Sequence, residues 1–144
     1  MTLLMRRLRN ARPVLGQIPP ELLRPMMTKE LFEYAKDQSI HVVRLQLPDQ
    51  LDAMEFDQLN SSLTLLLHSH AGGAWVVDLS AVTYMGSAVL GLMVNIRQQI
   101  KTAKGTLVLS GMSAPLYKIF STCCLERLFT ITKSYSEAMS LLRR

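Results

Sequence analysis

The sequence predicts a single α/β domain in which a mixed sheet of four to five strands packs against about four helices. Three observations predict it. A short apolar run at residues 75–79 precedes a tight loop and an amphipathic helix. A second such run, at residues 106–110, follows that helix, and strands joined by a helix are usually parallel. Alternating segments at 31–36 and 41–47, separated by a polar turn, indicate an antiparallel hairpin.

The first helix is predicted to run from Asp52 to about His70. Asp52 is a natural N-cap, and Glu55 stands three residues later, at the capping-box position. Spacings of three and four residues indicate one apolar side, which contains Met54, Leu59, Leu63, Leu66 and Leu67.

The central strand, loop and helix span residues 74–104. Gly72 and Gly73 form a turn before the strand, which we expect to be buried on both faces. Ser87 stands where the N-cap of the following helix belongs, so a plain capping role is one interpretation of this serine. The apolar side of that helix is predicted to contain Val89, Leu90, Leu92, Met93, Ile96 and Ile100.

Three further elements complete the domain. Ser113 followed by Pro115 predicts a helix start, and this helix runs to about Cys123. A short strand at 129–132 and a helix at 136–142 close the chain. We expect Cys123 and Cys124 to be small core residues of a protein kept in a reducing compartment, the cytoplasm.

Length and composition favour one domain. The chain has 144 residues, 49% of them hydrophobic, and no apolar run approaches the roughly 20 residues of a membrane-spanning helix. The formal net charge of +5 belongs to residues 1–29, because residues 30–144 carry ten basic and ten acidic side chains. The domain body therefore shows no bias toward nucleic acid.

Residues 1–29 are predicted to be a basic, Pro-containing and flexible extension, and residues 30–144 to be the domain. The extension is not a good secretory signal, because no sufficiently long apolar segment follows its arginines. A basic arm that touches a membrane surface or an acidic partner is the alternative interpretation, which we do not favour because Pro13 cuts the candidate helix short.

No catalytic set, cofactor site or metal site is expected. His68 and His70 form the one close histidine pair, and no Cys, Asp or Glu stands near enough in sequence to complete a metal-ligand set. Asp78 has no His or Cys beside it, and no Walker-type phosphate loop is present. We therefore expect a binding protein and not an enzyme.

Three stretches of the central region match a known pattern, namely Val77-Asp78-Leu79-Ser80, Tyr84-Met85-Gly86-Ser87-Ala88 and Leu90-Gly91-Leu92-Met93. Together they closely resemble the core of the STAS domain, the family of anti-sigma-factor antagonists and sulphate-transporter tails. Leu51-Asp52 and the segment from Leu125 to Phe129 resemble two further parts of the pattern. The resemblance spans about Leu31 to Leu142 and implies a STAS-type fold.

The resemblance implies a partner-binding face and a modification site. Ser87 falls on the position that a partner kinase phosphorylates in that family. The implied partner is a serine kinase of the anti-sigma-factor type, and the implied contact residues are Asp52, Tyr84, Met85, Gly86, Ser87, Ala88, Leu90 and Gly91. Gly86 stands where the family has Asp, Val89 and Asp49 stand where it has Gly, and Cys124 replaces a further Gly.

Three interpretations of the function stay open. The first is a switch in which phosphorylation of Ser87 releases the partner; without the family's Asp at position 86, a constitutive binder is its variant. The second is a STAS subunit that holds the ATPase of a membrane ABC system. The third is a module that binds a nucleotide or anion between the apolar strand ends and the helix N-terminus at Ser87.

Overall fold

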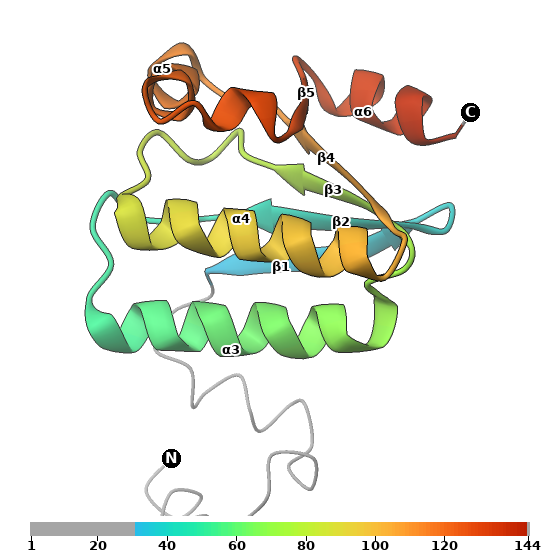
Figure 1. Ribbon diagram of the computed structural model, residues 1–144, viewed down its shortest axis with the longest axis horizontal. Coiled ribbons are helices and arrows are strands. Elements are labelled where there is room, and N and C mark those ends of the chain that lie inside the picture. Colours follow the sequence, from blue (N-terminus) through green and yellow to red (C-terminus); the bar gives the residue numbers. More distant parts are fainter. Residues whose placement is uncertain (1–30, 144) are drawn as a thin grey trace, which may run out of the picture. The chain divides into compact units, whose positions relative to one another are not determined.

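The structure is a computed structural model that describes residues 31–143 (Figure 1). One sheet contains five strands in the order β1-β2-β3-β4-β5. β1 is antiparallel to β2, and the remaining neighbours are parallel. The strands are β1 (Phe32–Asp37), β2 (Ile40–Leu45), β3 (Ala74–Asp78), β4 (Thr106–Ser110) and β5 (Thr130–Thr132). The predicted mixed sheet and the hairpin are therefore confirmed.

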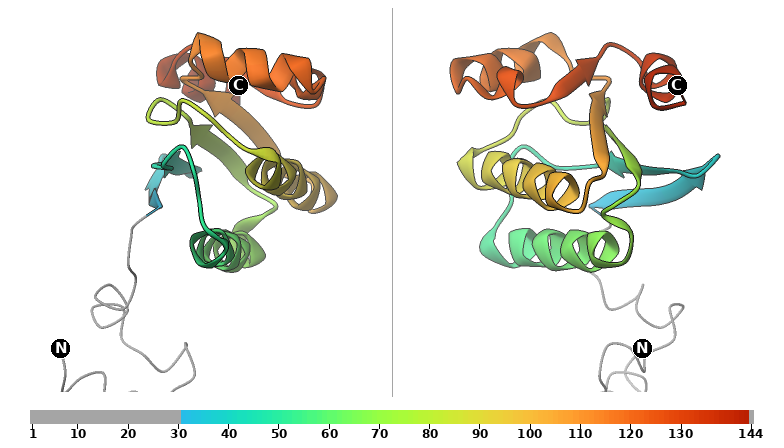
Figure 2. Two further views of the ribbon diagram at one scale, coloured as in Figure 1. Left: turned by 90° about the vertical axis from the view of Figure 1, so that its left-hand side faces the viewer. Right: turned by 45° about the vertical axis from the view of Figure 1, so that its right-hand side comes forward.

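Four α-helices accompany the sheet, as predicted: α3 (Ala53–His70), α4 (Ser87–Thr102), α5 (Ala114–Thr122) and α6 (Tyr135–Leu142). α3 and α4 lie side by side on one face of the sheet, and α6 lies on the other (Figure 2). A short 3₁₀ helix, η3 (Leu125–Arg127), follows α5 and was not predicted.

The sheet separates two apolar clusters. The larger one lies between the sheet and α3, α4 and α5, and Trp75 and Val77 of β3 belong to it. The smaller one lies under α6 and includes Val76, the residue between them. Because side chains alternate along a strand, this division confirms that β3 is buried on both faces.

Most of the predicted helix starts are confirmed. The Asp52 carboxylate accepts from the Glu55 backbone N–H at 2.7 Å, and the Glu55 carboxylate accepts from the Asp52 N–H at 3.1 Å. Ser113 caps α5. The prediction for Met54 was wrong, because its side chain is 68% exposed on the outer side of α3. Met54 lies in the first turn, before the buried stripe of Leu59, Leu63 and Leu67 begins.

The two cysteines do not belong to the core, so that prediction was also wrong. Both are free and exposed. α5 ends at Thr122, so the chain leaves the helical path before it can continue the buried stripe of Leu116 and Phe120. Cys124 adopts a left-handed conformation with φ 57°, which glycine adopts most easily. Its backbone is therefore suited to the glycine of the family pattern.

The predicted extension at residues 1–29 lies outside the described residues, so the domain boundary stays a prediction. Among the helices of residues 31–143, none is both long enough and apolar enough to cross a membrane.

Candidate functional site

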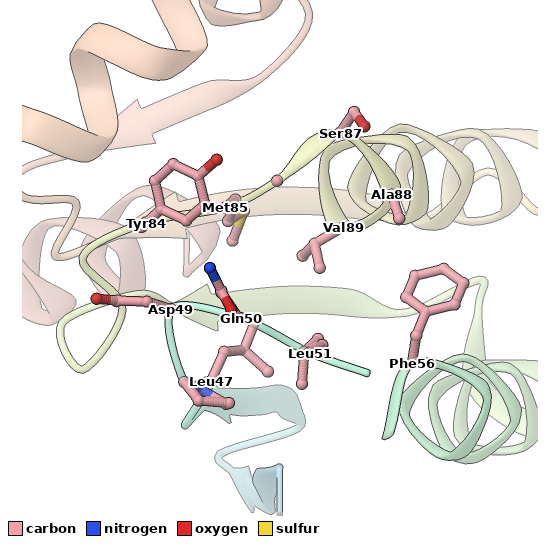
Figure 3. Close-up of a pocket in the computed structure, with 12 residues that line it drawn as sticks. Leu47, Asp49, Gln50, Leu51, Phe56, Tyr84, Met85, Ser87, Ala88 and Val89 are labelled. Carbon is pink, nitrogen blue, oxygen red and sulfur yellow. The ribbon is translucent and has the colours of Figure 1, made fainter. Parts of the chain in front are cut away.

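A groove opens at the carboxyl ends of the parallel strands, where α/β sheets commonly place ligand sites (Figure 3). Its volume is about 370 Å³. The β2–α3 loop forms one wall with residues 47–51, and Phe56 of α3 continues that wall. The other wall consists of residues 84–89, from the end of the β3–α4 loop and the start of α4.

Part of the groove lining is apolar, and we call this part its apolar interior; the polar residues Asp49, Gln50 and Ser87 also line the groove. Leu47, Met85 and Val89 are buried there. Leu51 and Phe56 are half-buried and occupy the N′ and N4 positions around the Asp52 cap, which is the pattern of a hydrophobic staple. The staple pattern and the capping box fix how the chain enters α3, and so they also fix one wall of the groove.

A hydrogen bond joins the two walls. Thr83 Oγ1 donates to Asp49 Oδ1 at 3.1 Å, so the β3–α4 loop is tied directly to the β2–α3 loop. Tyr84, the next residue, is 47% exposed at the rim of the groove. The two walls of the groove are thus connected by a side-chain hydrogen bond.

Asp78 anchors the start of the second wall. It is buried at the end of β3, where it accepts from Arg44 Nε at 3.0 Å and from the Ser80 backbone N–H at 2.9 Å. Gly111 takes a φ of +72°, and a Cβ there would meet Asp78 Oδ1 at 3.1 Å. The Ser80 N–H holds the turn out of β3, and Arg44 joins β3 to its neighbour β2, so this buried carboxylate has a positioning role.

Ser87 is the first residue of α4 and not its N-cap, which corrects the capping interpretation. The N-cap is Gly86, with extended backbone angles of φ −81° and ψ 176°, and no side chain caps this helix. Since the helix starts one residue earlier than predicted, the Ser87 side chain has left the capping position. It is exposed at the rim, and its hydroxyl points away from the groove (Figure 3).

The structure separates the other predicted contact residues into two groups. Asp52, Tyr84, Ala88 and Gly91 are exposed, and Gly86 is half-buried. Two residues belong to the core instead, because Met85 is 2% exposed and Leu90 is 8% exposed. Met85 and Leu90 therefore support the contact surface from below, and we remove them from it.

Sequence reasoning missed most of the first wall. Leu47, Asp49, Gln50, Leu51 and Phe56 all line the groove, and none of them was predicted as a contact residue. A signal was present in the staple pattern, because apolar residues at N′ and N4 flank the predicted cap. It indicates packing at a helix entry and does not by itself indicate a binding surface.

The chemistry available at the groove is that of recognition. Within residues 31–143, no group of three or more His, Cys, Asp or Glu side chains could hold a metal ion. The groove offers apolar surface, an exposed serine and carboxylates at its rim. Such a surface can hold a partner and can be changed by modification of the serine.

Comparisons with known proteins agree with this geometry. A family profile described as "Mlab, STAS domain" matches residues 34–131. A Thermotoga maritima protein, solved as a candidate anti-sigma factor antagonist, is 26% identical with a TM-score of 0.67; the match covers 78% of this chain and 95% of that chain. An anti-sigma-factor antagonist (STAS) domain protein from Planctomyces limnophilus is 17% identical with a TM-score of 0.68, and the match covers 78% and 98% of the two chains.

The phosphorylated form of the Bacillus cell fate determinant SpoIIAA is also similar. It is 18% identical with a TM-score of 0.56, and the match covers 76% of this chain and 96% of that chain. At this level of identity the likeness concerns the fold. The profile match covers more than half of the chain, and the fold agrees with it: this protein belongs to the STAS domain family and has the fold of the anti-sigma factor antagonists.

Proposed function

We propose that this protein is a non-enzymatic partner switch whose groove face docks a serine kinase of the anti-sigma-factor type. The groove face is defined by residues 47–52, Phe56, Tyr84, residues 86–89 and Gly91. The kinase phosphorylates Ser87 and then dissociates. Such a partner acts on transcription through a sigma factor, so we place the switch in the cytoplasm.

The observation that carries the proposal is the position of Ser87. Its side chain is exposed on the first turn of α4, at the rim of a groove that is partly lined by apolar side chains. A kinase that holds this face can reach the hydroxyl without opening the core. A buried or capping serine would have required local unfolding first.

The modification itself is a simple transfer. The Ser87 Oγ attacks the γ-phosphorus of ATP, the bond to the β-phosphate oxygen breaks and ADP leaves. The hydroxyl proton passes to a base on the kinase. This chain supplies only the acceptor hydroxyl and its position.

The phosphate adds about 1.5 to 2 negative charges at pH 7. The fold tolerates them, because Ser87 lies at the positive end of the α4 dipole and no side chain occupies the capping position there. A partner shaped for a hydroxyl must instead desolvate a bulky dianion. Docking is therefore lost without refolding.

Mass analysis of the protein purified from its own host tests the proposal. We expect an added phosphoryl group that maps to Ser87, and its loss in Ser87→Ala. Ser80→Ala is the matched control, because Ser80 is an exposed residue of the same loop and its contact with Asp78 is made by the backbone N–H, which alanine keeps. This variant should leave the modification in place. An unmodified Ser87 under every growth condition would contradict the switch.

A constitutive binder is the second candidate, and Gly86 favours it. This residue provides no carboxylate beside the acceptor serine, in contrast to the Asp of the family pattern. In that case the same face holds a partner permanently, and the ATPase of a membrane ABC system is the partner class. Affinity purification that recovers an ATPase in place of a kinase, with Ser87 unmodified, selects this candidate.

Anion or nucleotide binding is the third candidate. Only α4 lacks a side-chain cap among the four described α-helices, and its N-terminus opens at the groove. A thermal-shift screen with nucleotides and inorganic phosphate tests it. No shift with any of them counts against this candidate.

A further inference from the structure

The charges of the domain are divided along its sequence. Residues 46–96 contain five carboxylates and no Lys or Arg, whereas residues 97–143 contain seven basic and two acidic side chains. Both walls of the groove belong to the first of these segments. No Lys or Arg is therefore among the residues that line the groove.

Carboxylates concentrate along one wall. Asp49 lines the groove and is exposed, and Asp52 and Glu55 lie in the stretch between the lining residues Leu51 and Phe56. The capping box fixes Asp52 and Glu55, and the bond from Thr83 fixes Asp49. These three carboxylates, which we call the acidic rim, thus keep a fixed arrangement beside the apolar interior.

We propose that the acidic rim and the groove together bind a cationic segment of the partner protein, in which a large apolar side chain stands between Lys or Arg residues. The apolar side chain enters the groove against Leu51, Phe56 and Tyr84. The flanking cations meet the acidic rim. This inference rests on the proposed function, because it specifies the chemistry of the partner that docks on the same face.

Charge complementarity selects this occupant. A nucleotide or an acidic segment entering the groove would pass the acidic rim without a Lys or Arg in the lining to compensate its charge. A cationic segment is attracted over a distance of about one Debye length, roughly 10 Å at moderate salt, which raises its association rate. Apolar contact inside the groove then keeps it bound.

The cationic segment and the Ser87 hydroxyl occupy different parts of the face. The acidic rim belongs to the β2–α3 loop and the start of α3. Figure 3 shows Asp49 of this rim on one wall and the Ser87 hydroxyl on the opposite wall, pointing outward. The segment therefore engages the groove, and the catalytic part of the kinase approaches Ser87 from outside it.

Peptide display on the purified full-length chain tests the inference directly. A library of random linear peptides is selected at low salt, and bound peptides are eluted with high salt. We expect the enriched sequences to share an aromatic or large aliphatic residue flanked by Lys or Arg. Enrichment of acidic or uncharged sequences, or of none, overturns the inference.

Charge variants locate the bound peptide. The double variant Asp49→Asn and Asp52→Asn removes two charges and keeps both hydrogen-bond acceptors, since Asn also caps helices well. We expect it to weaken the selected peptide about tenfold. The matched control is Asp37→Asn with Glu137→Gln, which removes the same charge and should leave binding unchanged. Asp37 pairs with Ile40 at the amino end of β2, and Glu137 is on α6, so neither lines the groove. Equal effects of the two double variants overturn the assignment to the acidic rim.

A third variant tests the apolar part. Tyr84→Ala removes an exposed side chain at the rim and should weaken the peptide while unfolding at the same urea concentration as the wild type. Unchanged peptide affinity in Tyr84→Ala places the peptide elsewhere and also overturns the inference. Mass analysis of Ser87 is independent of these measurements, so the switch and the cationic segment can fail separately.

Discussion

The two ends of the parallel strands β2, β3 and β4 differ in how closely their loops pack and in the charges that they carry. At their amino ends, the connections pack closely against each other. At their carboxyl ends, the loops stand apart and leave the groove. The charges differ as well. Lys101 in the last turn of α4 and Lys104 just after that helix lie at the amino end, and the acidic rim lies at the carboxyl end. The comparison shows which end supplies stability and which end remains available for a partner.

The amino end is closed by backbone contacts and aromatic stacking. Gly105 donates its N–H to Ile100 O at 2.8 Å, and Thr106 donates to Gly73 O at 3.0 Å. Beside these turns, the His41 ring stacks on Trp75 with ring centroids 4.5 Å apart and on His70 at 4.9 Å. A Cβ on Gly73 would meet His41 at 3.1 Å. A side chain in place of a glycine at these turns should therefore destabilise the fold.

Gly105→Ala should have the largest effect on stability. Its Cβ would collide with the carbonyl oxygens of Ala71 and Gly73, and backbone atoms cannot move aside as a flexible side chain can. We expect the free energy of unfolding to fall by about 3 kcal/mol. Urea denaturation followed by circular dichroism measures it.

Gly91→Ala is the matched control for this substitution. Gly91 is exposed on α4, and a Cβ there has no neighbour within 4 Å. Helix propensity predicts a gain of about 0.5 to 1 kcal/mol. If both alanine variants changed stability by the same amount, the contrast between the two ends would be wrong at this position.

The stability of the amino end should also depend on pH through His41. Its side chain is 5% exposed, and Tyr34 Oη lies 2.7 Å from its Nδ1. Burial lowers the pKa of His41 from the ordinary value of 6.5, and the positive charges of His70 and Lys36 lower it further. The folded state therefore prefers the neutral ring.

Proton linkage gives the direction in which the free energy of unfolding changes with pH. Below pH 6.5 the unfolded chain binds a proton at His41 that the folded chain resists, so stability falls as the pH decreases from 6.5 toward the lowered pKa. One such group contributes a slope of at most about 1.4 kcal/mol per pH unit. Urea unfolding at pH 7.5 and at pH 5.5 should show a smaller difference in His41→Gln than in wild type. His68→Gln, on the exposed side of α3, should keep the wild-type difference.

The elements of the fold could be predicted because their signals are local. The alternation in β2, the apolar run of β3 and the Asp52–Glu55 capping box each depend on residues close in sequence. The wrong predictions concern residues whose surroundings depend on the position at which a helix begins or ends. Ser87 is displaced from the cap by a one-residue shift, and Cys123 leaves the buried stripe because α5 stops one residue before it.

The candidate site was only partly predictable. The resemblance to a family assigns a contact role to a run of neighbouring residues, but buried and exposed side chains alternate within that run. Tyr84 is exposed and Met85 beside it is buried, although both belong to the same matched motif. The first wall of the groove depends on how two loops meet, and the bond from Thr83 to Asp49 spans 34 residues. No local pattern encodes that contact.

The smallest expected change in stability is at Gly86. This residue is the N-cap of α4, and no side chain caps that helix. A side chain fits there, because φ is −81° and the nearest neighbour of a Cβ at this position would be Tyr84 Cε2 at 4.0 Å. In Gly86→Asp the carboxylate can accept from the free N–H groups of the first turn and interact favourably with the α4 dipole. We expect a gain of about 0.5 kcal/mol in the free energy of unfolding.

Gly86→Ala separates the cap from the loss of glycine flexibility. Alanine supplies no acceptor and is a poorer N-cap than glycine, so this variant should not be stabilised. Chemical denaturation of the three proteins at pH 7 measures the order Asp above Gly above Ala. Equal stability of the Asp and Ala variants would show that a side-chain cap at the N-terminus of α4 does not stabilise the protein. If the order holds, the uncapped end is a place where this chain gives up stability, on the one surface that the proposed partner must recognise.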